Sequence, residues 1–312
     1  ESLGDGHAAA FWLSDSLGAD IREQNRSLPV PVFPRPHPLP EFSRRPLRYS
    51  VTDLDRYSDD PYAFYAKRIL RLRELPPLDQ DPDQAEFGKA LHAVLEGFVK
   101  LHPKALPAGA YQRLVAMARD AFEPYLRRPA LAHVWWPRID RMLQHFLAIE
   151  SELRSQSYHS VVEQNLEYVQ QVSGHNVTLR ARIDRIDIGK THARLIDYKT
   201  GAAQAIKNAQ DFRSLQLPLS AWILMQLSPE FLCAQSVAEL AYINLKPTDP
   251  QEHWQAMSCD EAYFIKAGEH LEHLLQTLLT DCDAFGATYS DSRKEQANPY
   301  AHLTRRQEWC GV

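Results

Sequence analysis

Asp184, Asp197 and Lys199 are residues whose types and spacing would suit metal-assisted chemistry. If they share one face of a sheet, two carboxylates and an amine lie among apolar neighbours, which is costly unless a cation binds the carboxylates. Mg²⁺ takes oxygen ligands and keeps several waters, so the two aspartates and the backbone carbonyl of Tyr198 would form part of its shell. Lys199 would then lie beside a water or a substrate phosphate. The alternative is an exposed hairpin whose charges are simply solvated.

The elements that must position these residues are two strands joined by a turn. Two apolar runs, Ala181 to Ile188 and Ala193 to Tyr198, flank the polar residues Gly189 to His192, and this pattern predicts a β-hairpin. Side chains alternate between the two faces of a strand. A turn of two or four residues therefore places Asp184 on the same face as Asp197 and Lys199, whereas a turn of three would separate them.

Three segments in this region resemble a known family. The run ARIDRID from Ala181, the run LIDYKTG from Leu195 and the sequence QLPL from Gln216 are similar to the RecB-like branch of the PD-(D/E)XK nucleases. In that family two aspartates bind metal, the lysine supports the chemistry and the glutamine contacts the site. The resemblance assigns these roles to Asp184, Asp197, Lys199 and Gln216.

A helix predicted for Gln84 to Leu101 carries a further candidate. Its apolar residues recur at helical spacing, and His92 lies beside that stripe, one turn after Gly88. A single histidine on a helix is more often a structural residue than a ligand. In the RecB-like nucleases, however, a G-x-x-x-H helix precedes the hairpin and its histidine reaches the metal. The resemblance therefore makes His92 a third metal ligand.

Composition limits the classes of partner. The 312 residues carry a net charge of −5 with a pI of about 6.2, which argues against a broad basic surface for nucleic acid. Contacts with a DNA backbone must then be local, and the basic residues nearest the hairpin are Arg182, Arg185, Lys207 and Arg213. Glu163, on a strand predicted for Tyr158 to Val172, is a secondary site candidate.

We expect a cytoplasmic location for this chain. It contains no apolar run of the ~20 residues that a membrane-spanning helix needs, and its start does not resemble a signal peptide. Its four cysteines include no C-x-x-C pair, so we expect reduced thiols.

The predicted elements follow the order helices, strand, hairpin, helix, strand and long helix. The last three are predicted over Asp211 to Leu227, Val237 to Leu245 and Asp260 to Phe285. This order predicts an α/β fold with a mixed central sheet flanked by helices. The resemblance implies the same PD-(D/E)XK, or restriction endonuclease-like, fold with a helical N-terminal extension. Seven prolines between Pro29 and Pro46 favour an extended segment, either an interdomain linker or an arm along the domain surface. We therefore expect an N-terminal segment and tether over residues 1–48 and a nuclease domain over residues 49–312.

The resemblance is strongest to the C-terminal nuclease domains of the AddB family. It covers about Tyr49 to Trp309 and includes the segment SVTDLDRYSDDPYAFYAKRILRLR from Ser50. Many members carry a cysteine before the proline of this segment and three clustered cysteines near the C-terminus, which hold a [4Fe-4S] cluster. Here Asp60 takes the first position and the cysteines are scattered, so we expect no iron-sulfur cluster. Many members also have a tyrosine four residues after the glutamine, where this chain has Ser220.

The function implied is Mg²⁺-dependent hydrolysis of DNA phosphodiesters, with Mn²⁺ able to substitute. The resemblance further implies an exonuclease acting on single-stranded ends within an ATP-dependent helicase-nuclease complex of double-strand break repair and recombination. The partner would be an AddA-like helicase-nuclease subunit, because the chain has no G-x-x-x-x-G-K-[ST] phosphate loop. Two alternatives are a nuclease-fold module that binds DNA without cleaving it, and a stand-alone RecB-like nuclease of a mobile element.

Overall fold

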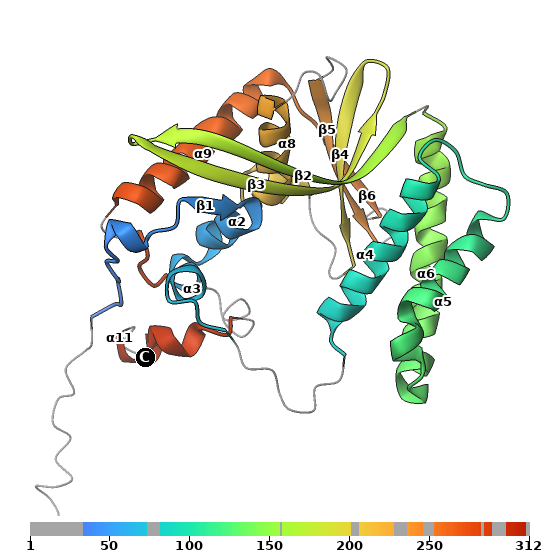
Figure 1. Cartoon of the computed structure of the whole chain (residues 1–312), viewed down its shortest axis with the longest axis horizontal. Helices are drawn as coiled ribbons and strands as arrows, with labels where there is room; N and C mark the ends of the chain where they lie inside the picture. Colours follow the sequence, from blue (N-terminus) through green and yellow to red (C-terminus); the bar gives the residue numbers. More distant parts are fainter. Residues whose placement is uncertain are drawn as a thin grey trace, which may run out of the picture.

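A mixed sheet with helices on both sides forms the core of the molecule (Figure 1). The computed structural model describes residues 34–73, 82–156, 158–200, 206–227, 236–245, 253–281, 284–288 and 298–309. Most of the N-terminal segment expected over residues 1–48 lies outside these ranges. Within them, the predicted α/β class with a central mixed sheet flanked by helices is confirmed.

The sheet has six strands in the described part of the chain. They are β1 (Arg48–Ser50), β2 (His159–Val172), β3 (His175–Ile188), β4 (His192–Lys199), β5 (Ser236–Asn244) and β6 (Trp254–Ser258). The order is β1-β3-β4-β5-β6, with β2 paired to the other edge of β3. The β2–β3, β3–β4 and β5–β6 pairs are antiparallel, and the β1–β3 and β4–β5 pairs are parallel. The sequence predicted β2, β3, β4 and β5 but not β1 or β6.

One edge of β3 changes partners along its length. β1 pairs with Thr178 to Arg180, and β4 pairs with Arg185 to Ile188. Between them, Ala181 to Asp184 form no pair with another described strand on that edge, while β2 continues along the opposite edge. β2 and β3 together form a long twisted ribbon that passes over β1 and α2 (Figure 1). The sheet is therefore split next to Asp184.

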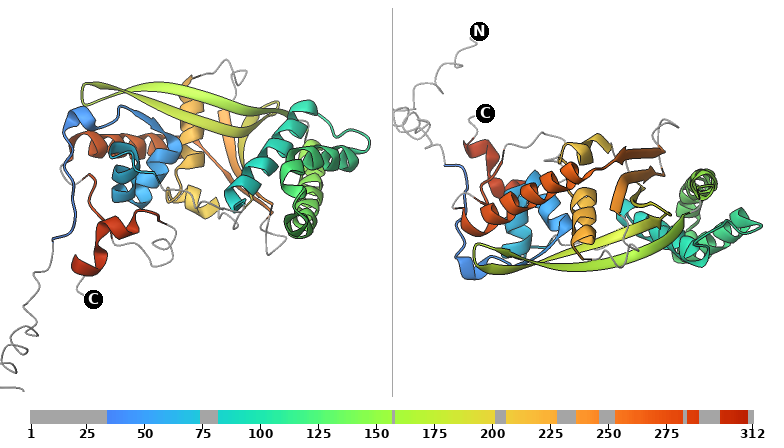
Figure 2. Two further views of the ribbon diagram at one scale, coloured as in Figure 1. Left: turned by 60° about the horizontal axis from the view of Figure 1, so that its bottom comes forward. Right: turned by 90° about the horizontal axis from the view of Figure 1, so that it is seen from above.

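Helices cover the two faces of the sheet with different parts of the chain. α4 (Gln84–Leu101), α5 (Ala110–Leu126) and α6 (Pro129–Arg154) pack against Ile196, Tyr198 and Ile243. α8 (Gln216–Leu227) and α9 (Glu261–Thr280), with the short α7 (Ile206–Gln210), cover Leu195 and Leu240. Figure 2 shows α4 to α6, in teal and green, at one end of the β2–β3 ribbon and α9, in orange, at the other. No helix of the described residues has the length and hydropathy to cross a bilayer.

Short helices lead into the sheet. Ser50 begins α2 (Val51–Asp59) with a capping box, in which its side chain accepts from the Asp53 amide and the Asp53 carboxylate accepts from the Ser50 amide. Asp60 then caps α3 (Pro61–Phe64), with proline in the first turn, and a π-helical turn, η2 (Tyr65–Ile69), follows.

The proline-rich segment lies against the C-terminal part of the domain where it is described. After the one-turn η1 (Phe42–Arg44), Arg45 donates to the carbonyls of Leu278 and Asp281 at 3.0 and 3.1 Å. The Ala287 amide donates to the Pro36 carbonyl at 2.8 Å. Residues 35–45 therefore run along the surface of the domain. The chain closes with η4 (Ala301–Thr304) and α11 (Arg306–Trp309), which lie below α3 in Figure 1.

Candidate active site

The hairpin register sets the positions of the two aspartates. Arg185 pairs with Ile196 and Ile188 with Ala193, so Gly189 is opposite His192, whose carbonyl accepts from the Gly189 amide at 3.0 Å. Extending this register by one step from Arg185 places Asp184 opposite Asp197. The strands separate there, and the Asp184 carboxylate accepts from the Tyr198 amide at 3.2 Å. The turn therefore contains two residues, Lys190 and Thr191, and an even number of turn residues places the two carboxylates on the same face.

Asp197, Lys199 and Gln216 form a closed triangle of polar contacts. Lys199 Nζ lies 2.7 Å from Asp197 Oδ2 and 3.3 Å from Gln216 Oε1. Gln216 Nε2 donates to Asp197 Oδ1 at 2.8 Å. The amide group thus has its oxygen toward the ammonium and its nitrogen toward the carboxylate, as their charges require. The structure brings together three of the four residues assigned catalytic roles, with Asp184 across the hairpin.

Asp197 is the electrostatic centre of this group. It is 5% exposed, and burial raises its pKa to about 6, with Asp184 adding to the rise and Lys199 opposing it. Among the described residues, Asp197 Oδ2 accepts no hydrogen bond of good geometry, and its charged neighbour is Lys199. A buried carboxylate with a single cation beside it is a site that favours further positive charge.

His92 approaches Asp184 from α4. Its Nδ1 lies 3.6 Å from Asp184 Oδ2, and its ring also hydrogen-bonds the backbone of Tyr198. Burial lowers the pKa of His92 and outweighs the opposite effect of Asp184. A neutral imidazole is the form that can ligate a metal. The structure therefore places His92 beside Asp184, and its role as a third metal ligand stays a prediction.

His92, Asp184 and Gln216 line a cavity of about 1020 Å³, together with Thr200. The donors offered by the site are two carboxylates, the Tyr198 carbonyl and an imidazole, a set that suits a hard divalent cation. No three His, Cys, Asp or Glu side chains within the described ranges are grouped to hold a metal ion by themselves. In the structure the Asp197 carboxylate contacts the Lys199 ammonium and accepts a hydrogen bond from Gln216. The donor chemistry fits a metal, with the backbone carbonyl and water needed to complete its shell.

Asp55 on α2 is a positioning residue that the sequence analysis missed. Its carboxylate accepts from the backbone amides of Leu215, which precedes α8, and Gln216, which begins it. Burial raises the pKa of Asp55, while these amides and Lys199 oppose the rise. A carboxylate at a helix N-terminus is stabilised by the helix dipole. Asp55 thereby fixes the end of α8 from which Gln216 reaches Asp197, a long-range contact without a sequence signal.

Glu163 and Arg182 lie together on the cavity wall. Arg182 is 61% exposed on its side chain, forms an ion pair with Glu163 and lies 3.8 Å from Glu96 of α4. Burial and a hydrogen bond with Glu163 raise the pKa of Glu96 to about 7. Glu163 has a left-handed backbone with φ of 52°, which for a residue other than glycine requires support from its surroundings. Arg182 thus remains a candidate for phosphate contact, and Glu163 is part of the same wall.

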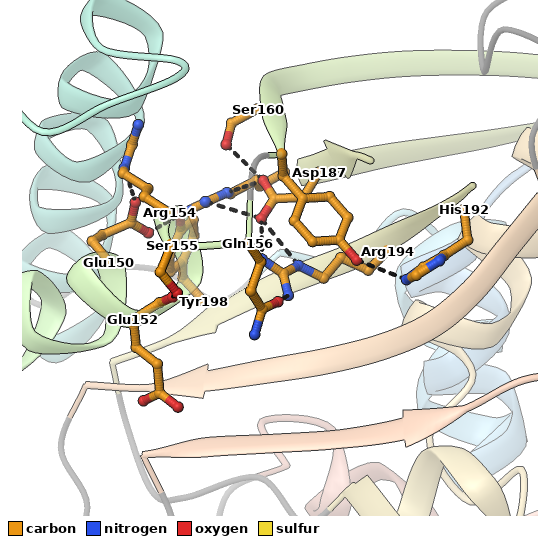
Figure 3. A network of polar contacts seen from close by, with 12 residues as sticks. Glu150, Glu152, Arg154, Ser155, Gln156, Ser160, Asp187, His192, Arg194 and Tyr198 are labelled. Carbon is orange, nitrogen blue, oxygen red and sulfur yellow. Dashed lines mark hydrogen bonds and ion pairs between the residues drawn. The ribbon is translucent and has the colours of Figure 1, made fainter. Parts of the chain in front are cut away.

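The prediction that Arg185 contacts DNA is wrong. Adjacent residues of a strand point to opposite faces, and Arg185 takes the face that α6 covers, where it is 1% exposed. Its guanidinium forms ion pairs with Glu150 and Asp187 and donates to the Tyr198 hydroxyl at 3.1 Å. Figure 3 shows the surrounding network, in which Asp187 lies between buried cations and Ser160. Arg185 is a core residue that supports β4.

Lys207 and Arg213 are exposed on α7 and on the turn that follows it. Neither is among the described residues that line the catalytic cavity. The structure therefore leaves them as surface cations, and their predicted contact with a DNA backbone stays a prediction.

Ser220 and Asp60 occupy the two positions that differ from the family pattern. Ser220 is buried, and its hydroxyl donates to the Gln216 carbonyl at 2.6 Å, one turn earlier in α8. Asp60 caps α3 and accepts from the Asn298 side chain at 2.6 Å. A direct hydrogen bond thus links the N-terminal helices to the C-terminal segment at Asp60.

Gly88 permits the close approach of α4 to the end of β4. A Cβ at Gly88 would lie 2.9 Å from Thr200 Oγ1, next to Lys199, whereas a Cβ at Gly97 would lie 3.2 Å from the flexible tip of Met117. We expect Gly88→Ala to lower cleavage on the order of 10-fold to 100-fold by shifting β4. Gly97→Ala, the control on the same helix, should change stability by no more than about 1 kcal/mol.

Cleavage assays and urea unfolding of both variants check this. Adding Thr200→Ala to Gly88→Ala removes the obstructing oxygen and should restore activity. Equal activity of Gly88→Ala and Gly97→Ala would show that the approach at Gly88 does not position the site.

Comparison with known proteins gives the family. The PD-(D/E)XK nuclease superfamily matches residues 48–307. This range contains every residue of the site described above, from Asp55 to Gln216. The chain belongs to the PD-(D/E)XK nuclease superfamily.

More specific relatives are distant and much longer. An uncharacterized protein from Rickettsia bellii (strain RML369-C) is 26% identical over 270 residues, which are 81% of this chain and 32% of that protein. A subunit of the ATP-dependent helicase/deoxyribonuclease from Carboxydothermus hydrogenoformans (strain ATCC BAA-161 / DSM 6008 / Z-2901) is 24% identical over 298 residues, 81% of this chain and 27% of that protein. The chain therefore spans about a third or less of the length of these relatives.

Among solved structures, a candidate exonuclease from Eubacterium rectale is similar at 9% identity, with a TM-score of 0.44 over 77% of this chain and 82% of that one.

Proposed function

We propose that this chain is the metal-dependent DNA nuclease domain of a helicase-nuclease subunit. The observation that carries the proposal is the meeting of Asp184, Asp197, Lys199 and Gln216 where the sheet splits, with His92 beside them. Similarity to subunits of ATP-dependent helicase/deoxyribonucleases supports the wider context, which is an AddB-like protein in double-strand break repair and recombination. In that context the domain acts as an exonuclease on single-stranded ends.

Asp184, Asp197, the Tyr198 carbonyl and His92 would hold Mg²⁺, or Mn²⁺ in its place. The bound ion supplies charge stabilisation to the phosphoryl group and activates water for attack. Lys199 holds its ammonium next to the Asp197 carboxylate, where it can orient the attacking water or offset negative charge in the transition state. Gln216 fixes the orientation of both groups, and Asp55 fixes Gln216.

The partner would be an AddA-like helicase-nuclease subunit. Residues 1–312 contain no phosphate loop of the G-x-x-x-x-G-K-[ST] type, so the motor that unwinds duplex DNA for this domain would lie outside them, and the AddA-like subunit would supply it. Many members of the family have a cluster-binding cysteine where this chain has Asp60. This difference supports a domain without an iron-sulfur cluster.

The test is cleavage of end-labelled single-stranded and duplex DNA by this chain with Mg²⁺, Mn²⁺ or EDTA. We expect cleavage of single strands with either metal and none with EDTA. Asp184→Asn, which keeps the size of the side chain and removes its charge, should reduce cleavage on the order of 10² or more. Equal products from the wild type and Asp184→Asn, or cleavage that persists in EDTA, would contradict the proposal. DNA binding without cleavage would favour the non-catalytic module.

A further inference from the structure

A second cavity of about 1220 Å³ lies beside the catalytic one, between α2, α3, η2 and the C-terminal segment. Thr52 of α2 lines both cavities. Asp55, which fixes the first turn of α8, also lines the second cavity. The two cavities therefore meet close to the residues that position Gln216.

Cations dominate the wall of the second cavity. The five basic residues in it are Arg56, Lys67, Arg68, Arg71 and Arg73. Three aspartates also line it, and two of them are engaged by neutral donors, Asp55 by backbone amides of α8 and Asp60 by Ala63 and Asn298. This concentration of positive charge contrasts with the net charge of −5 of the whole chain.

Among the described residues, two of these five cations share one carboxylate and the other three form no ion pair. Asp53 pairs with both Arg68, at 3.5 Å, and Arg56, at 3.9 Å. Within the described ranges, no ion pair is formed by Lys67, Arg71 or Arg73, all of which are exposed. Burial and the neighbouring Arg56 lower the pKa of Lys67. Lys67, Arg71 and Arg73 therefore form a cationic surface that an anionic ligand would stabilise.

An aromatic ring lies in the same wall. Tyr300 lines the cavity, and its hydroxyl donates to the Leu72 carbonyl at 2.9 Å, which holds the ring in place. Proteins that bind single-stranded nucleic acid combine a cationic groove for the backbone with aromatic side chains on which bases stack. The second cavity has both features, and it opens next to the catalytic cavity.

We propose that the second cavity binds the phosphodiester backbone of single-stranded DNA on one side of the bond being cleaved. The catalytic cavity is rich in carboxylates and needs metal to receive a phosphate, whereas the second cavity binds phosphate through Lys67, Arg71 and Arg73 without metal. The inference rests on the proposed function for the identity of the polymer. It adds a binding site for the DNA strand on one side of the catalytic residues. The DNA would pass between the two cavities at Thr52, which lines both.

The test uses Lys67→Gln/Arg71→Gln, because both side chains are exposed and unpaired among the described residues. The matched control is Lys104→Gln/Arg113→Gln, which removes the same charges from exposed positions outside both cavities. Binding of a fluorescent dT20 oligonucleotide is measured by anisotropy in EDTA over a range of salt concentrations. The cavity variant should bind on the order of 10-fold more weakly, and its slope of log affinity against log salt should fall by about 1.4. The control should match the wild type.

Two further measurements separate this inference from the proposed function. With Mn²⁺, the cavity variant should lose kcat/KM on dT20 but retain hydrolysis of bis(p-nitrophenyl) phosphate, which is too small to span both cavities. If the wild type cleaves neither substrate, the proposed function fails while the anisotropy result still supports the site. An unchanged salt slope in the cavity variant would overturn the inference. So would displacement of dT20 by millimolar inorganic phosphate, since the site would then be one for a small anion.

Discussion

Replacing Lys199 with alanine is expected to lower single-turnover cleavage by a factor on the order of 10² or more while leaving metal binding intact. Lys199 lies against Asp197 and Gln216 and is proposed to act on water or phosphate, not as a ligand. Its removal takes a like charge away from the place of the metal, so Mn²⁺ affinity should be unchanged or slightly higher. Asp184→Ala and Asp197→Ala should instead lose both metal affinity and cleavage.

Calorimetric Mn²⁺ titration and single-turnover cleavage of the same preparations decide between these roles. The measurements belong at pH 8, because Lys199 lowers the pKa of Asp197, which is about 6, and its loss lets that pKa rise. Lys199→Arg, which keeps the charge but changes its shape, should recover only part of the activity. Full activity of Lys199→Ala would mean that these roles are wrongly assigned. Loss of metal binding in Lys199→Ala with its retention in Asp197→Ala would mean the same.

The parts of the site that lie within one hairpin or one helix could be predicted from the sequence. The alternation of β3 and β4 and the polar turn from Gly189 fix which residues face each other, because strand periodicity and turn length leave few registers. The helix over Gln84–Leu101 was predicted from its apolar stripe with the bounds it has in the structure, where a capping box at Asp83 begins it.

Contacts between segments that are distant in the sequence were harder to predict. Arg185 was placed on a DNA surface because it is basic and next to Asp184, although the alternation of the strand already turns it to the other face. That error was avoidable from sequence. The cap that Asp55 provides for α8 was not, because 160 residues separate the carboxylate from the Leu215 amide and no local pattern links them. Tertiary packing sets such pairs.

The buried ion network behind the site leads to the largest expected effect on stability. Asp187 is fully buried and accepts from Arg185, from Arg194 and from the Ser160 hydroxyl at distances of 2.6 to 3.1 Å. Burial alone would raise the pKa of Asp187, but the two arginines outweigh it, and the pKa is lowered. Since Arg185 also donates to the Tyr198 hydroxyl, the network holds the strand that carries Asp197 and Lys199.

Asp187→Asn should destabilise the fold by about 3–5 kcal/mol, because it leaves buried guanidinium groups without their carboxylate. Glu167→Gln is the matched control, since Glu167 on the same β2–β3 ribbon also contacts two arginines, Arg48 and Arg180, but its side chain is 49% exposed. The control should cost no more than about 1 kcal/mol. Urea unfolding of the two variants and the wild type, followed by circular dichroism, measures both values.

The pH dependence gives an independent readout of the same group. The folded-state pKa of Asp187 lies below its ordinary value of 3.8, so its contribution is complete above about pH 4 and is lost as the pH falls through the folded-state value. Asp187→Asn should therefore remove part of the acid-induced loss of stability that the wild type shows, in addition to lowering stability at neutral pH. If Asp187→Asn costs no more than Glu167→Gln at pH 7, then burial does not make this network essential, and β4 must be held in place by the apolar packing of Ile196 and Tyr198 instead.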